Sequence, residues 1–129
     1  QYVQNAAARL IFRAPKSDHV SPLLQKLHWL AISCRIEHKI SSLCYNSLSG
    51  IGPQYLSDLT QVYTSCRCLR SSSDTRILKI PKVKTKSYGQ RSFAYQGPII
   101  WNKLPLEIRH QGKIDGLKQA LKTYLFRFQ

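Results

Sequence analysis

A helix is predicted by residues 32–50, which read ISCRIEHKISSLCYNSLSG. Apolar side chains recur there at the three- and four-residue spacing that places them on one helix face, and they are Ile32, Ile36, Ile40, Leu43, Cys44 and Leu48. Arg35, Glu37 and Lys39 fall mostly on the other face, and Gly50 is a plausible C-terminal stop. We therefore expect a helix that buries its isoleucine-rich side and ends near residue 50.

The N-terminal end of the chain predicts two further helices. Apolar residues form one helical face in the first of them, namely Val3, Ala6, Ala7, Leu10 and Ile11. Pro15 disfavours helical backbone at Ala14 and is expected to end this helix. Ser21 and Pro22 are typical of a second helix start, with serine as the N-cap and proline in the first turn.

The C-terminal end predicts a longer helix from Ile114 to Phe126. Its apolar residues fall on one face, and they are Ile114, Leu117, Leu121, Tyr124 and Leu125. Lys118 and Lys122 lie one turn apart on the outside. A short helix is also expected over residues 53–59.

The middle of the chain predicts short strands. Residues 77–80 are expected to form a strand stopped by Pro81, and residues 90–95 a second strand that enters a Gly97–Pro98 turn. Lysines alternate with other side chains over residues 82–86, which suits an exposed strand or an extended arm. The expected fold class is α+β, with N-terminal helices, a basic irregular or β-rich middle and a C-terminal helix.

The net charge of the chain is strongly positive. Twenty Lys and Arg face six Asp and Glu over 129 residues, which gives +14. Such a surface favours a polyanionic partner, and we expect RNA or DNA rather than an anionic membrane because the charge is not gathered on one amphipathic helix. No apolar run approaches the length of a membrane span, and no secretory signal is visible. We expect a cytoplasmic and nuclear protein with no membrane partner.

Half of the net charge is concentrated between residues 67 and 91. Eight cations and one acid, Asp74, give +7 in these 25 residues. Cations along an extended segment match the spacing of a phosphate backbone, and counterion release then drives association; a solvated loop without a partner is the alternative. The candidate nucleic-acid-binding residues are these eight and two arginines one turn apart in the first helix: Arg9, Arg13, Arg67, Arg70, Arg76, Lys79, Lys82, Lys84, Lys86 and Arg91. Tyr88, Phe93 and Tyr95 could stack on unpaired bases or form the core side of a strand.

Catalytic and metal-binding patterns are missing from the sequence. The six acids are scattered singly, so no carboxylate pair is placed to hold Mg²⁺. Neither a glycine-rich phosphate loop nor a nucleophile elbow occurs. Cys66 and Cys68 form a C-x-C pair rather than the usual zinc spacing, whereas Cys34 and Cys44 are expected to be buried free thiols. We expect no enzyme activity, metal or cofactor in this chain.

Eight short runs, taken in order, resemble one known family. The runs are QNAAARLI (4–11), LHWLAI (27–32), RIEHKI (35–40), PQYLSDL (53–59), RCLRSS (67–72), RSFAY (91–95), PIIWNKLP (98–105) and LKTYLF (121–126). Their order and spacing resemble the C-terminal region of the second open reading frame of LINE-type (non-LTR) retrotransposons, in particular the CR1-like and Rex-like elements. The resemblance covers nearly the whole chain, and it is the ordered set, rather than any one run, that is specific.

The resemblance implies a place in a larger protein. In that family an endonuclease and a polymerase of fingers, palm and thumb precede this region, and the catalytic aspartates that use Mg²⁺ lie in the palm, upstream of Gln1. Residues 1–50 would be a helical, thumb-like segment, and residues 51–129 a basic tail after the polymerase, with short strands and a C-terminal helix. The chain lacks Met, which also suggests a piece of a longer frame. Ala31, where the family usually has proline, favours a degenerate copy.

Two functions follow as hypotheses. The leading one is a non-catalytic module that holds template RNA, or an RNA–DNA hybrid, while an upstream palm of the same open reading frame copies it. The alternative is a structural segment that packs onto the polymerase and has no binding role of its own. An independent enzyme activity is the least expected, because no catalytic set is present.

Overall fold

The protein is helical in the part of the chain that the structure describes. The computed structural model describes residues 1–64 and 76–127, and helices account for 61% of them. The elements in chain order are α1 (Tyr2–Phe12), α2 (Ser21–Lys26), α3 (Ile32–Leu48), α4 (Gln54–Leu59), the 3-10 turn η2 (Gly89–Arg91), α5 (Phe93–Lys103), α6 (Leu106–Arg109) and α7 (Ile114–Phe126). The helices predicted near both ends of the chain are confirmed.

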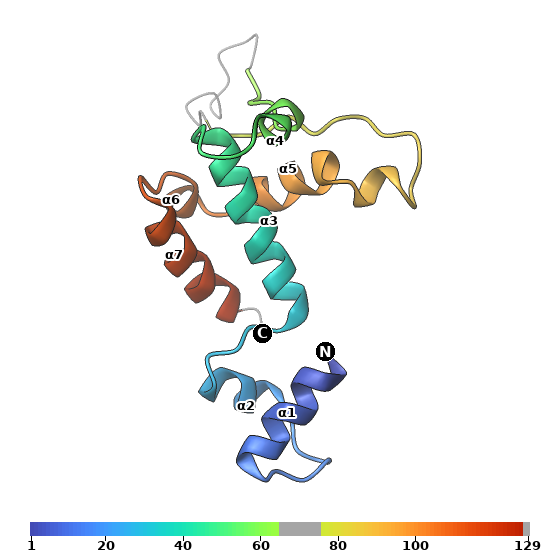
Figure 1. Ribbon diagram of the computed structural model, residues 1–129, viewed down its shortest axis with the longest axis vertical. Helices are drawn as coiled ribbons and strands as arrows, with labels where there is room; N and C mark the ends of the chain where they lie inside the picture. The colour runs from blue at the N-terminus through green and yellow to red at the C-terminus, as the bar shows by residue number, and fades with distance from the viewer. Residues whose placement is uncertain (65–75, 128–129) are drawn as a thin grey trace.

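The core forms where α3 meets α5 and α7. Figure 1 shows α3 running along the long axis, with α7 beside it and α5 crossing it. The buried side chains in this cluster are Cys44, Tyr45, Leu78, Trp101, Leu104, Ile108, Leu117 and Leu121. The core therefore uses segments from both sides of residue 50. The helices α1 and α2 pack on each other at the opposite end of the molecule from α4 and α5 (Figure 1).

The helix α3 buries only part of the isoleucine-rich face that was expected. Ile40 and Leu48 are partly buried and pack against the core beside Cys44. Ile32 and Ile36 are exposed, and the buried residues of α3 are Cys34, Ser41, Ser42, Cys44, Tyr45 and Ser47. Small side chains on this face let neighbouring helices approach closely, because little volume separates the backbones. The prediction that Ile32 and Ile36 are buried was wrong, whereas Cys44 is buried as expected.

The contact between α3 and α5 explains why the expected Gly97–Pro98 turn is helical instead. A Cβ atom on Gly97 would lie 3.1 Å from the sulfur of Cys44 and 3.5 Å from the Phe93 ring. The missing side chain lets α5 pass close to α3, and Gly97 and Pro98 are both buried inside the helix. Tertiary packing therefore overrides the local turn signal at this point.

The helix α1 turns its apolar side towards solvent. Val3 is 84% exposed and Leu10 is 81% exposed, while Ala8 is the buried residue of this helix. The polar edge faces the protein: the Gln4 amide donates to the Leu30 carbonyl at 2.8 Å, and the Ile32 amide donates to the Gln1 side-chain oxygen at 2.9 Å. The apolar face of α1, which was expected to be buried, is therefore the face exposed to solvent.

The expected β-rich middle is wrong for the residues that the structure describes. Residues 77–80 contribute one isolated antiparallel bridge, in which Val62 pairs with Leu78, and residues 82–86 form no strand. The strand expected at residues 90–95 is replaced by η2 and the first turn of α5. The amides of Tyr95 and Gln96 bond to the Ser92 carbonyl at 3.2 and 2.9 Å, which starts the helix.

Candidate nucleic-acid interface

The basic residues after Leu78 lie on one loop that leaves the core and returns to it. Residues 79–91 contain five cations and no acid, a net charge of +5. The exposed members are Lys79, Lys82, Lys84, Lys86 and Arg91. Figure 1 shows residues 79–92 as a loop that extends away from α4 before it enters α5. We call residues 79–91 the basic loop.

The start of the basic loop is held firmly by α5. The Asn102 side chain accepts a hydrogen bond from the Leu78 amide at 2.9 Å and donates one to the Leu78 carbonyl at 2.8 Å. The indole of Trp101 donates to the Arg76 carbonyl at 2.7 Å. Leu78 itself is only 1% exposed and belongs to the core. Lys79 therefore projects from a fixed backbone position. The role of Asn102 could not be predicted from the sequence, because a single asparagine forms no recognisable motif.

The end of the basic loop is folded back on itself. The Gly89 amide donates to the Thr85 hydroxyl at 3.0 Å, and the Gln90 amide donates to the Thr85 carbonyl at 3.2 Å. A Cβ atom on Gly89 would lie 2.9 Å from that hydroxyl and 3.0 Å from Val83 Cβ. The close approach requires glycine, and it draws the lysines at 82, 84 and 86 into one short bend.

Arg76 points inward, unlike the loop lysines. Its guanidinium is half-buried and donates to the carbonyl of Arg109 at 2.7 Å and to that of Gln111 at 3.4 Å. The Arg109 carbonyl belongs to the last residue of α6 and the Gln111 carbonyl lies two residues beyond it, where backbone acceptors lack helical partners. Arg76 thus ties the chain before the basic loop to the end of α6.

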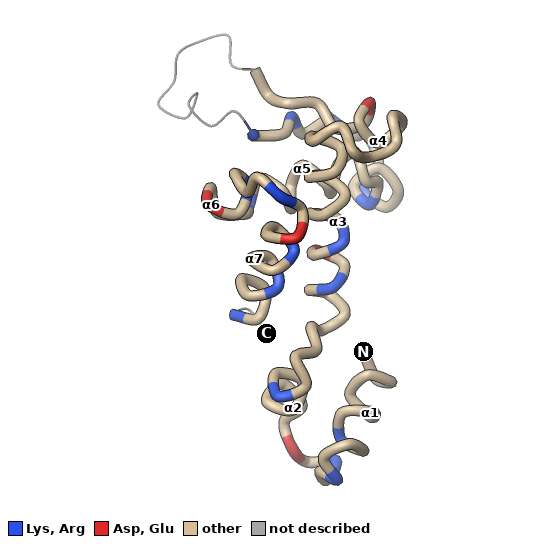
Figure 2. The backbone as a smooth tube through the Cα atoms, turned by 60° about the vertical axis from the view of Figure 1, so that its left-hand side comes forward, with Lys and Arg blue, Asp and Glu red and all other residues tan. Residues whose placement is uncertain are grey.

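Arg9 and Arg13 lie far from the basic loop. Figure 2 shows the Lys and Arg of α1 at one end of the molecule, and other Lys and Arg positions beside α4 and α5 at the opposite end. Arg9 is half-buried and donates to the Asp18 carbonyl at 3.2 Å, whereas Arg13 is exposed in a left-handed backbone conformation with φ 50°. The candidate residues that the structure describes therefore do not form one continuous surface.

Four residues singled out in the sequence lie outside the described residues. They are Arg67 and Arg70 of the candidate interface, and the cysteines Cys66 and Cys68.

The aromatic residues near the basic loop differ in exposure. Tyr88 is 87% exposed and adjoins the last loop lysines, so its ring is available to stack on a base. Phe93 packs against the core, and Tyr95 is half-buried at the first turn of α5. A stacking role is therefore open to Tyr88, while Phe93 holds α5 in place.

The described residues bring no metal-binding set together. No group of three His, Cys, Asp or Glu side chains that could hold an ion occurs within residues 1–64 and 76–127. Cys34 and Cys44 are buried free thiols, as expected. Burial raises the pKa of the Cys44 thiol to about 12, so this sulfur stays protonated at neutral pH and is a poor nucleophile.

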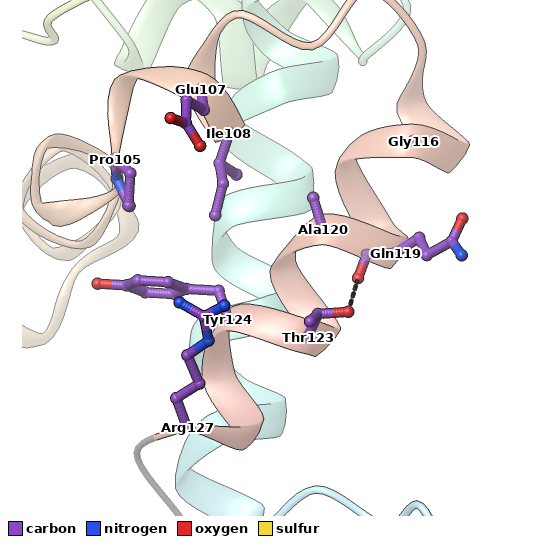
Figure 3. Close-up of a pocket in the computed structure, with 9 residues that line it drawn as sticks. All are labelled: Pro105, Glu107, Ile108, Gly116, Gln119, Ala120, Thr123, Tyr124 and Arg127. Atoms are coloured by element: carbon purple, nitrogen blue, oxygen red, sulfur yellow. Dashed lines mark hydrogen bonds between the residues drawn. The ribbon is translucent and has the colours of Figure 1, made fainter.

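A cavity of about 430 Å³ lies between α6 and α7, away from the basic loop (Figure 3). Ile108, Ala120 and the Tyr124 ring form part of its wall, and the Arg127 side chain extends towards that ring. Among the described residues that line it, Glu107 supplies a single carboxylate. One carboxylate gives no acid–base pair, and no candidate interface residue contributes to this cavity.

Comparison of the chain with protein-family models, with curated proteins and with solved structures finds no match. None of the described helices combines the length and the hydropathy that a membrane crossing requires.

Proposed function

We propose that this chain is a non-catalytic nucleic-acid-binding segment that grips phosphates with its basic loop. The observation that carries the proposal is the run of five exposed cations, from Lys79 to Arg91, with no acid among them. Nothing within the loop neutralises these side chains, so a phosphate backbone gains their full attraction and releases its condensed counterions. The likeness of the sequence to the C-terminal region of LINE-type reverse transcriptases supports RNA, DNA or their hybrid as the ligand.

The proposed grip uses the loop lysines and Arg91 rather than all ten candidate residues. Arg76 has its guanidinium bonded to backbone carbonyls, and Arg9 is half-buried at the opposite end of the molecule. Lys82, Lys84 and Lys86 lie in the bend closed by Gly89 and are free to reach a strand that crosses it. Contacts of this kind read the backbone and not the bases.

The proposal is tested by titrating labelled RNA and DNA duplexes with the protein across a range of salt concentrations. If about four phosphates are neutralised, log K falls against log salt with a slope of about −3.5 on duplex DNA. Changing Lys82, Lys84 and Lys86 together to Ala should weaken binding to every sequence about equally and flatten this slope by about 3.

The matched control changes Lys16, Lys39 and Lys113 to Ala. These lysines are also exposed but lie outside the basic loop, so the net charge falls by the same amount. We expect a much smaller loss of affinity than with the loop variant. Equal losses would show that only the total charge matters, and a salt-independent affinity would remove the electrostatic basis of the proposal.

A second candidate function is a packing segment of a larger polymerase, and the outward apolar face of α1 favours it. Val3 and Leu10 lie on this face next to Tyr2, which is 92% exposed. Exposed apolar residues in such a row are typical of a surface that another protein segment covers. In this case the isolated chain should self-associate, and the basic loop variant should bind nucleic acid no more weakly than the original chain.

A further inference from the structure

A cavity of about 610 Å³ opens at the root of the basic loop, between the end of α4 and the segment that follows Leu78. Its lining combines three kinds of side chain. The two cations are Lys79 and Lys82, and the two hydrogen-bonding side chains are Asp58 and Gln61. The other lining side chains are apolar and include Leu59 and Ile80. The sequence pattern did not indicate this cavity, because residues 58–61 and 79–82 meet only in the folded chain.

Both walls of the cavity are anchored to the core. On one side the Lys79 amide donates to the Gln61 carbonyl at 2.8 Å, directly after the Leu78 backbone that Asn102 holds. On the other side α4 is fixed to α3: the Ser57 hydroxyl donates to the Ser47 carbonyl at 3.2 Å, and the Thr60 and Ser47 hydroxyls are hydrogen-bonded. The cavity is therefore preformed rather than a gap between loose segments.

The apolar part of the lining suits the flat face of a nucleobase. Leu59 is 47% exposed and Ile80 is 46% exposed, and Pro81 and Ala94 complete this part of the wall. Apolar side chains commonly cover the faces of bases that are taken out of a stack. A base in this position would place its sugar and phosphate near the lysines of the same cavity.

The charged lining contains both signs of charge. Lys79 and Lys82 attract a phosphate, whereas Asp58 repels one and accepts hydrogen bonds only. Asp58 makes no ion pair with any residue in the described part of the chain, and one of its oxygens accepts from Gln54 at 3.1 Å. The remaining acceptor capacity fits an N–H donor on the pairing edge of a base.

We propose that this cavity binds one unstacked nucleotide of a single strand, with its phosphate at Lys79 and Lys82 and an exocyclic amino group at Asp58. The inference deepens the proposed function and rests on it, because the same strand continues along the basic loop. The proposed site adds a preference among bases, which phosphate contacts alone do not give. Cytosine carries an amino group where uracil carries a carbonyl oxygen. The Asp58 carboxylate only accepts hydrogen bonds, so it should favour cytosine and disfavour uracil.

The test compares oligo(C) and oligo(U) RNA of the same length by fluorescence anisotropy at a pH above neutrality, where cytosine is unprotonated. We expect oligo(C) to bind about three- to tenfold more tightly, which is the net effect of one hydrogen bond. Changing Asp58 to Ala should remove the difference, because oligo(C) loses its hydrogen bond and oligo(U) is no longer repelled by the carboxylate. Circular dichroism of the variant confirms that it is folded.

The control variant is Glu107→Ala, which removes an exposed acid outside this cavity. It changes the net charge equally and should leave the ratio of the two affinities intact. Equal binding of both oligonucleotides by the original chain, or a ratio that Asp58→Ala leaves unchanged, overturns the nucleotide site while phosphate binding stands. Absence of any binding overturns the proposed function, and the nucleotide site with it.

Discussion

At the scale of single residues, Gly97 decides how closely two helices of the core can pack. The Cβ position of Gly97 lies 3.1 Å from Cys44 Sγ, tighter than ordinary van der Waals contact, and both residues are buried. A larger side chain there would have to push α5 away from α3. Well-packed cores resist such insertions because the surrounding side chains are already in their preferred rotamers.

We expect the change of Gly97 to Val to lower the free energy of unfolding by about 1–3 kcal/mol. Urea denaturation followed by circular dichroism measures this loss. The matched control is Gly112→Val, because a Cβ atom on Gly112 meets no atom within 4 Å. Similar losses at both glycines would mean that the effect comes from backbone conformation and not from the contact with Cys44.

Other residues show where local signals are sufficient and where they are not. Pro15 and Gly50 indicated the ends of α1 and α3, and the structure ends those helices at Phe12 and Leu48. Such signals succeed because they act through the backbone of a few neighbouring residues. The roles of Asn102 and Gly97 depend on partners far along the chain, so no short-range pattern reveals them.

At the scale of elements, periodicity predicted that a helix exists but not which of its faces is buried. In α7 the predicted apolar face is the buried face, since Leu117, Leu121 and Leu125 are buried as expected. In α3 only the C-terminal part of the expected face packs against the core, and in α1 the apolar face is outside. A helix buries the side that fits its neighbours, and hydrophobicity alone does not determine that fit.

The orientation of α1 gives a prediction at this scale. Changing Val3 and Leu10 together to Ser should alter the free energy of unfolding by no more than about 1 kcal/mol, because both side chains are already in water. The same variant should reduce self-association, since an exposed apolar row is removed. Thermal unfolding and sedimentation velocity measure the two effects.

The comparison variant is Leu24→Ala in α2, whose side chain is buried. It should cost about 2–5 kcal/mol, as buried leucines do. A comparable loss in the Val3 and Leu10 variant would show that the outer face of α1 is covered within the chain in solution.

At the scale of the whole molecule, the dominant property is positive charge. The net charge of +14 is spread over a chain of 129 residues, and the described cations lie on α3 and α7 as well as at the two ends of the fold (Figure 2). Like charges repel in the compact state, so the folded protein carries an electrostatic cost that salt or a polyanion reduces.

We therefore expect the melting temperature to rise by several degrees between about 20 and about 200 mM NaCl, as the screening length falls from about 20 Å to about 7 Å. Differential scanning calorimetry at fixed pH measures this. The variant with Ala at positions 82, 84 and 86 should show a smaller rise. A melting temperature that falls with salt would indicate that attractive ion pairs outweigh the repulsion.

The sequence alone determined the properties that depend on composition and on neighbouring residues. These are the charge, the helices near each end of the chain, and the concentration of cations after residue 66. Only the tertiary structure decided that the middle of the chain enters α5 instead of a strand, that α1 faces outward, and that residues 58–61 meet 79–82. Contacts between distant segments outweigh local preferences because burial of apolar surface acts on the whole chain at once.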